Sequence, residues 1–143
     1  GESWTLEFSA KMSSLTTTRV KDHAPHRGFL INVLTPTRHY AVGFSKDLIG
    51  VADSAQLYND MPAGVVSGYD TDFHTWKIVY NSADYSMVIF KDGVEVATFN
   101  WVLGKDKAEN ANFSLSLIVN SMDTTSDSEL LEVYIDSVKI KFE

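Results

Sequence analysis

The sequence contains no cysteine, no long apolar run and no concentration of basic residues. The absence of cysteine excludes disulfide bonds, thiolate catalysis and metal sites with cysteine ligands. The net charge is −7, from 19 acidic and 12 basic residues, so nucleic acid and anionic membrane are not expected partners. Because no run approaches the roughly 18 apolar residues of a membrane-spanning helix, no membrane span is predicted.

The chain has 143 residues, of which 44% are hydrophobic. This length and composition are typical of one folded domain with a single core. No linker, repeat or low-complexity tract divides the sequence, so a single domain over residues 1–143 is predicted.

Alternation of apolar and polar residues recurs along the chain, whereas the spacing of an amphipathic helix is scarce. The alternation is clear at residues 4–12, 39–45 and 112–120, and each segment is predicted to form a strand with one solvent-exposed face. Residues 27–35 are apolar on both faces, which is typical of a strand in the middle of a covered sheet. A short helical turn is expected at 105–110. About nine to eleven short strands at this spacing predict an all-β sandwich or barrel.

The segment 74–101 is predicted to form a three-stranded meander. Asp92-Gly93 lies between two β-rich runs, and this dipeptide favours a type I′ hairpin turn, in which both central residues have positive φ. Such a turn would place Ile89 opposite Val96. The predicted core face carries Trp76, Ile78, Val88, Phe90 and Phe99.

The last strand contains a change of phase. The apolar residues Leu131, Val133 and Ile135 are odd-numbered, whereas Val138, Ile140 and Phe142 are even-numbered. A strand can bury both sets on one face only if an extra residue is inserted between them. The sequence therefore predicts a β-bulge at Asp136-Ser137.

The order of these elements resembles that of the concanavalin A-like lectin and glucanase superfamily. The resemblance rests on an aromatic first strand, "HTWKIVY" (74–80), "VIFKDGVEVA" (88–97) and the closing "EVYIDSVKIKF" (132–142). It implies an all-β, antiparallel two-sheet jelly-roll sandwich, as in laminin G-like domains and carbohydrate-binding modules, whose concave face or edge loops bind glycans. It also implies an exported bacterial protein, often with a neighbouring glycoside hydrolase domain. Because one fold serves binders and enzymes, function must be argued from a site.

The enzymes of this superfamily carry carboxylates on one strand in the pattern Glu-x-Asp-x-x-Glu, and this sequence departs from that pattern. Glu129 and Glu132 are three residues apart, so a strand would point them to opposite faces. Glu132 and Asp136 share a face only without the predicted bulge, and Glu95 has no acidic neighbour in register. No catalytic residue is assigned, and a glycoside hydrolase is kept as an alternative.

The resemblance also implies a structural calcium ion where the first and last strands meet, with Asp136 as the matching residue. A bulge frees backbone carbonyls that can join carboxylates around a hard cation, and Glu2 or Glu7 could contribute from the N-terminal part of the chain. The alternative is that Asp136 only accepts hydrogen bonds from backbone N–H groups at the bulge. The histidines match no zinc spacing, and His74 is expected to hydrogen-bond at a strand entrance. No cofactor is required.

Glycan binding needs rings that stack on the apolar face of a sugar and polar groups that pair with its hydroxyls. Suitable residues gather at 23–28, 37–40 and 56–60. Trp101 ends the hairpin, where its ring could face a groove, with core packing as the alternative; the other two tryptophans are assigned to the core. The predicted glycan-binding residues are Arg27, Arg38, His39, Tyr40, Tyr58, Asn59 and Trp101.

The sequence therefore favours a lectin-like, carbohydrate-binding module of an exported, polysaccharide-processing protein. The expected location is secreted, periplasmic or at the cell surface, and the expected partners are a glycan and a neighbouring catalytic domain in a longer chain. Besides the hydrolase, a laminin G-like adhesion or protein-interaction domain is an alternative.

Overall fold

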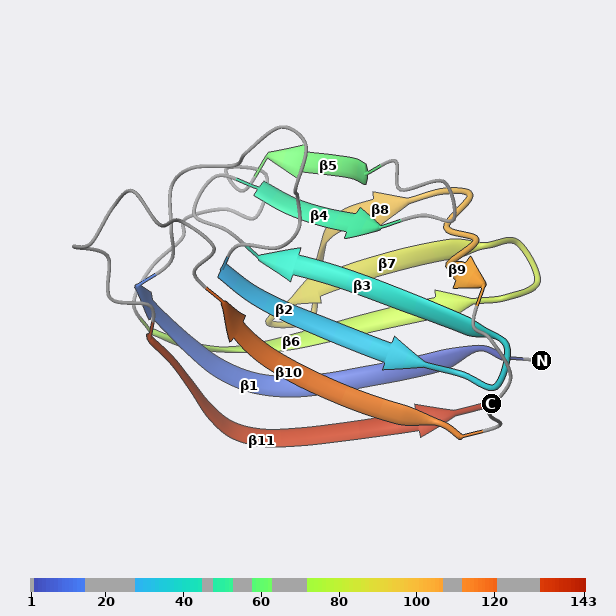
Figure 1. Cartoon of the computed structure of the whole chain (residues 1–143). Coiled ribbons are helices and arrows are strands. Elements are labelled where there is room, and N and C mark those ends of the chain that lie inside the picture. Colours follow the sequence, from blue (N-terminus) through green and yellow to red (C-terminus); the bar gives the residue numbers. More distant parts are fainter. Residues whose placement is uncertain are drawn as a thin grey trace.

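A computed structural model describes residues 2–14, 28–44, 48–52, 58–62, 72–106, 112–120 and 132–143. Within these ranges the chain forms eleven strands and no helix. The strands form two antiparallel sheets that pack face to face (Figure 1). The all-β, two-sheet prediction is confirmed.

The first sheet has the strand order β11-β1-β6-β7-β8. Its strands are β1 (Trp4–Ser14), β6 (Phe73–Asn81), β7 (Ser86–Lys91), β8 (Val94–Phe99) and β11 (Glu132–Phe142). The first and last strands of the chain are neighbours, with Trp4 opposite Phe142. The start of β1 and the end of β11 therefore lie at the same end of the sandwich (Figure 1).

The second sheet has the order β10-β2-β3-β4-β5, and a short strand, β9, pairs with β3. Its strands are β2 (Gly28–Leu34), β3 (Arg38–Phe44), β4 (Leu48–Ala52), β5 (Tyr58–Pro62), β9 (Lys105–Asp106) and β10 (Ser114–Asn120). Residues 58–62 pair with β4 although their composition indicates a turn. The helical turn expected at 105–110 is wrong for its first two residues, because they pair with β3. Residues 107–110 lie outside the described ranges.

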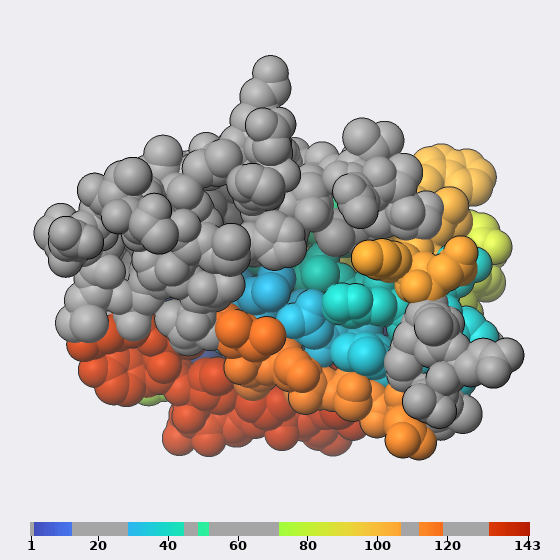
Figure 2. Space-filling model, in the orientation of Figure 1, coloured from blue at the N-terminus to red at the C-terminus, as the bar shows by residue number. Residues whose placement is uncertain are grey.

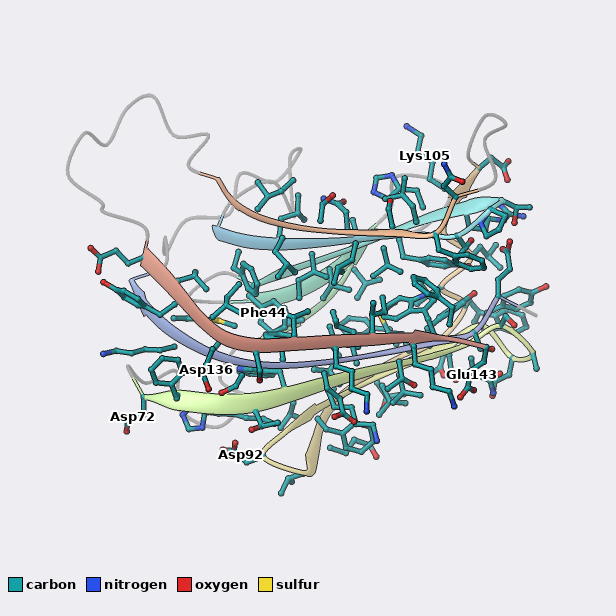
Figure 3. The ribbon with its side chains drawn as sticks, turned by 90° about the horizontal axis from the view of Figure 1, so that it is seen from below. Phe44, Asp72, Asp92, Lys105, Asp136 and Glu143 are labelled. Atoms are coloured by element: carbon teal, nitrogen blue, oxygen red, sulfur yellow. The ribbon has the colours of Figure 1, made fainter. Side chains whose placement is uncertain are left out.

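The core lies between the sheets and is rich in aromatic rings. Phe44 projects into the space between the two layers (Figure 3), where its ring meets that of Trp76 at 5.1 Å. Trp4 meets Tyr40 and Tyr80 nearer the other end. Each fully buried large apolar side chain contributes roughly 1.5–3 kcal/mol, so these rings hold the layers together.

The hairpin turn between β7 and β8 is of the predicted kind. Asp92 and Gly93 both have positive φ, at 50° and 80°. The Asp92 carboxylate accepts a hydrogen bond of 2.9 Å from the Thr75 N–H and lies 2.6 Å from His74 Nδ1. These two contacts hold the pKa of Asp92 below its usual value. The expectation that His74 hydrogen-bonds at a strand entrance is confirmed.

The predicted register beyond this turn is wrong by one residue. A register shift places Ile89 opposite Ala97, so Val96 is an extra residue in β8. The pairing of β6 with β7 also differs by one residue from the prediction, because Ile78 lies opposite Ile89. Val88 and Phe90 therefore lie half-buried on the outer face, whereas Trp76, Ile78 and Phe99 face inward as predicted. The core face of the meander is instead Trp76, Ile78, Tyr80, Met87, Ile89, Ala97 and Phe99.

The β-bulge predicted in the last strand is confirmed. Ser137 lies opposite Ser9 and Ile135 lies opposite Ala10, so Asp136 is the inserted residue. Asp136 is exposed at the bend of β11 (Figure 3). The insertion brings Val133 and Ile140 onto the same, inner face of the strand, where both pack against the core.

Deletion of Asp136 is expected to destabilise the domain by about 3 kcal/mol or more. The deletion removes the phase change, so the apolar residues on one side of it must turn outward, and each lost burial costs roughly 1.5–3 kcal/mol. Urea unfolding in metal-free buffer measures the effect. Asp136→Ala keeps the inserted residue and should stay within about 0.5 kcal/mol of the parent. Equal stability of the deletion variant would contradict the assigned register.

Candidate functional site

Two exposed aromatic rings lie together at one end of the sandwich. Trp101, in the connection from β8 to β9, is 71% exposed, and Tyr85, in the turn from β6 to β7, is 40% exposed. Their rings are stacked at an interplanar angle of 27° with centroids 6.3 Å apart. Trp101 is therefore not a core residue, and that alternative is excluded. We call these two residues the aromatic pair.

The connection that carries Trp101 is anchored directly after this residue. Val102 is fully buried, its N–H donates to the Tyr85 carbonyl at 2.9 Å, and its carbonyl accepts a hydrogen bond of 3.0 Å from the buried Tyr80 hydroxyl. Gly104 has φ of 70°, and a Cβ there would lie 2.7 Å from the Tyr40 ring. These contacts hold the segment against the core while Trp101 points away from it.

Both members of the aromatic pair have a left-handed backbone, with φ of 58° at Tyr85 and 62° at Trp101. For bulky residues this conformation costs roughly 1–3 kcal/mol each, and it persists only where surrounding contacts determine it. Such strain is found most often at binding sites. The fold therefore presents a large apolar ring to solvent from an anchored backbone.

A second group of polar side chains lies on the outer face of the second sheet. His39 Nε2 lies 2.8 Å from Asn32 Oδ1, and Lys105 is opposite His39 in the pairing of β9 with β3. Lys105 projects outward from this sheet (Figure 3). Arg38 donates to Asp106, so its charge is balanced within β3 and β9. We call Asn32, His39 and Lys105 the polar row.

The six predicted glycan-binding residues that the structure describes do not form one site. His39 lies on the outer face of the second sheet, Arg38 precedes it in β3 and has the opposite phase, and Trp101 lies in the aromatic pair. Tyr40 is buried at 2% exposure, so its assignment to a surface site is wrong; its position in an alternating strand directs it inward. Tyr58 and Asn59 are at register positions opposite Ala52 and Val51. The remaining candidate, at position 27, lies outside the described ranges.

Tyr40 also shows how closed this part of the core is. Burial, together with the neighbouring Tyr80, raises the pKa of the Tyr40 hydroxyl far above its usual value. The two ring centroids are 4.4 Å apart. A sugar therefore cannot reach the Tyr40 ring without opening the domain.

Glu2 joins the first strand to the turn between β2 and β3. Its carboxylate accepts hydrogen bonds from Thr35 Oγ1 at 3.0 Å, Thr37 N at 3.2 Å and Thr37 Oγ1 at 2.6 Å. Partial burial opposes ionisation, but these bonds and the charge of Arg38 outweigh it and lower the pKa of Glu2. Glu2 is thus a structural residue at the same end as the aromatic pair.

The described residues do not bring Glu2 to the expected calcium site. Asp136 lies beside Ser9, which is seven positions along the strand from Glu2, or about 23 Å in extended chain. Glu7 is nearer, and its carboxylate lies 3.9 Å from Lys77 Nζ. Within the described ranges, no three histidine, aspartate or glutamate side chains gather in a metal-binding group.

The acidic residues considered for hydrolysis lie in separate places. Glu95 is exposed near the hairpin tip and accepts a hydrogen bond of 2.5 Å from Thr98. Glu132 accepts one of 3.1 Å from Tyr134. Asp136 is the inserted residue of the confirmed bulge, so it and Glu132 do not lie in one regular strand phase. Glu129 lies outside the described ranges.

Three residues of these two groups were not among the sequence candidates. Tyr85 was passed over because a tyrosine in a turn carries no signal of its own, and its partner is sixteen positions away. Asn32 lies in an apolar strand, and Lys105 lies where a helical turn was expected. The packing of the β8–β9 connection brings Tyr85 to Trp101, and the pairing of β2, β3 and β9 assembles the polar row.

No protein-family model and no curated protein matches the chain. Solved structures do match its fold. One is the binding domain of botulinum neurotoxin serotype D, with a TM-score of 0.60 and 14% identity over 98% of this chain and 32% of that one. A pentraxin from Limulus polyphemus has a TM-score of 0.59 and 12% identity over 97% of this chain and 63% of that one. A galectin from Caenorhabditis elegans has a TM-score of 0.53 and 13% identity over 99% of this chain and 84% of that one.

The fold is an antiparallel, two-sheet jelly-roll sandwich. At these identities the likeness shows the fold alone. The chain spans about a third of the toxin binding domain and under two thirds of the pentraxin. Within the described ranges, no helix has the length and apolar character needed to cross a membrane.

Tyr80→Phe is expected to loosen Trp101 and to destabilise the domain by about 1–3 kcal/mol, because the Val102 carbonyl stays buried without its donor. Trp4 and Trp76 are buried, so acrylamide quenching and fluorescence anisotropy of the exposed population report on Trp101. We expect a lower fluorescence anisotropy and stronger acrylamide quenching of this population in the variant, because Trp101 moves faster. Tyr134→Phe, which removes a surface hydroxyl from β11, is the matched control and should change neither value. Unchanged Trp101 anisotropy in Tyr80→Phe would disprove the anchoring role.

Proposed function

We propose that this domain binds glycans and that the Trp101 ring stacks against the apolar C–H face of a sugar. The observation that carries the proposal is the exposed aromatic pair on an anchored backbone. A tryptophan that is 71% exposed adds little buried area to the core, yet the connection around it is held by buried contacts. Rings with an apolar face and a nearby polar rim suit ligands that are partly apolar and partly hydroxylated.

The structural neighbours support this proposal without deciding it. They include a galectin, a pentraxin and toxin binding domains. Their shared jelly roll is consistent with membership of the concanavalin A-like superfamily, which we propose for this chain. The fold is also shared by enzymes, so the aromatic pair carries the argument.

Trp101→Ala is expected to abolish detectable glycan binding or weaken it at least tenfold. Removal of the ring eliminates the stacking surface, and tenfold corresponds to about 1.4 kcal/mol. Binding is measured first on a glycan array and then by affinity gel electrophoresis with the polysaccharides that are retained. Trp101→Phe keeps an aromatic face and should retain part of the affinity.

Phe73→Ala is the matched control for loss of an exposed ring. Phe73 is 52% exposed at the start of β6, away from the aromatic pair, which adjoins the end of that strand. Its removal should leave glycan affinity unchanged. The proposal is refuted if Trp101→Ala binds as well as the parent, or if no array glycan is retained by the parent protein.

The retained polysaccharides and the same protein also distinguish two other functions. A glycoside hydrolase would release reducing sugar from a retained polysaccharide and lose that activity when one glutamate is changed. A laminin G-like interaction domain would retain no glycan and would instead capture a protein whose binding depends on defined surface residues. The separated positions of Glu95 and Glu132 favour binding over hydrolysis.

We further propose that the domain belongs to a longer, exported, polysaccharide-processing protein, and that a catalytic domain adjoins it. One observation supports only the longer chain: the matched region corresponds to about a third of the toxin binding domain. Cell fractionation with an antibody to the domain tests the location. Recovery from the cytoplasmic fraction would refute export.

A structural calcium ion at Asp136 is also proposed, since the bulge exposes a carboxylate between two strands. Bound calcium would stabilise the native state by mass action. The midpoint of thermal unfolding should then rise in millimolar calcium and fall in EDTA, and Asp136→Ala should remove the difference. An equal midpoint in calcium and in EDTA would dismiss the ion.

A further inference from the structure

We propose that the glycan site is an extended strip that runs from the aromatic pair, along the connection to β9, to the polar row on the second sheet. Its ligand is accordingly an oligosaccharide of several units rather than a single sugar. This inference rests on the proposed glycan binding and specifies the class of glycan.

The two parts of the strip are joined by a short and well-anchored segment. Trp101 and Lys105 are four residues apart, so their Cα atoms are separated by at most about 14 Å. Between them, Val102 and Gly104 are held against the core. β9, the segment before it and the outer surface of β2 and β3 are visible together from one side of the molecule (Figure 2). One ligand can therefore contact both parts.

The two parts offer different chemistry. At the aromatic pair the surface is a ring face, which binds the apolar side of a sugar. In the polar row, Asn32 presents its carbonyl oxygen to His39, and an amide side chain also carries two N–H donors. The exposed Lys105 adds an ammonium group, and the exposed Ser116 lies opposite Asn32 in the adjoining strand. These are partners for sugar hydroxyls, not stacking surfaces.

A single sugar stacked on Trp101 would leave the polar row unused. A chain of several sugars can stack at one end and hydrogen-bond at the other, and each net hydrogen bond is worth about 0.5–1.5 kcal/mol. The strip therefore predicts that affinity rises with chain length and then levels once the polar row is reached. It also predicts that substitutions in the polar row affect long ligands only.

The test uses five homologous series of one to six units: cello-, xylo-, manno-, malto- and galacto-oligosaccharides. Isothermal titration calorimetry should show, for at least one series, a Kd that falls tenfold or more between the shortest bound member and the hexasaccharide. Lys105→Ala and Asn32→Ala should each weaken hexasaccharide binding about five- to tenfold, which is about 1–1.4 kcal/mol. Both should leave the affinity for the shortest bound member unchanged.

Lys139→Ala removes a surface lysine from β11 on the other sheet and is the matched control. It should bind every member like the parent. Because Lys105 and Lys139 are both exposed, neither variant is expected to unfold, and circular dichroism melts verify this.

The outcomes separate the strip from the proposed function. Binding that needs Trp101 but is equally tight for every chain length, or is unaffected by both polar-row variants, overturns the strip and leaves glycan binding intact. The absence of binding at any length, together with an empty glycan array, overturns both. Length-dependent binding lost in either polar-row variant supports the strip.

Discussion

The contact between Tyr40 and Tyr80 is the interaction on which the rest of the structure depends. Tyr40 comes from the second sheet and Tyr80 from the first, and their ring centroids lie 4.4 Å apart between the two sheets. Trp4 packs against both rings. The pair therefore joins the two layers directly, at the end where the first and last strands also meet.

The same two tyrosines support the surface above them. The Tyr80 hydroxyl holds the Val102 carbonyl, and the Tyr40 ring fills the space beside Gly104. Val102 and Gly104 lie between Trp101 and β9, so both contacts hold the part of the connection that directly follows the exposed ring. An exposed ring is thus fixed by buried ones, and the cost of the left-handed backbone at Trp101 is offset by packing below it. Binding surfaces that are ordered in advance lose less entropy when a ligand arrives.

Much of the fold could be predicted from the sequence, and the failures have physical causes. The alternation of apolar and polar residues correctly predicted β1 and β10, and the change in its phase correctly predicted the bulge at Asp136. Both signals are local, because the alternation of side chains along a strand involves consecutive residues only. The dipeptide Asp92-Gly93 identified its turn for the same reason. The inward face of β7 was assigned incorrectly, because residues 87–90 are all apolar and alternation cannot select between the two faces of such a strand.

The site was less predictable than the fold. Trp101 could be predicted as a glycan-binding candidate because a tryptophan directly after a hairpin is unusual. Whether its ring is exposed depends on how the next residue, Val102, packs into the core, and the sequence does not show this. Tyr40 shows the opposite case: its residue type suits a sugar site, whereas its place in an alternating strand directs it inward. Pairs such as Tyr85 with Trp101 depend on packing between distant segments, which spacing in the sequence does not reveal.

The bulge in β11 has a further effect on how copies of this domain meet. In the described part of the chain, β11 is an outer strand of its sheet, and such strands expose N–H and C=O groups that can pair with another molecule. A bulge bends this row, and Lys139 and Lys141 place like charges along it. Asp136, the inserted residue that lets both halves of the last strand face the core, therefore also makes that strand a poor template for edge-to-edge aggregation.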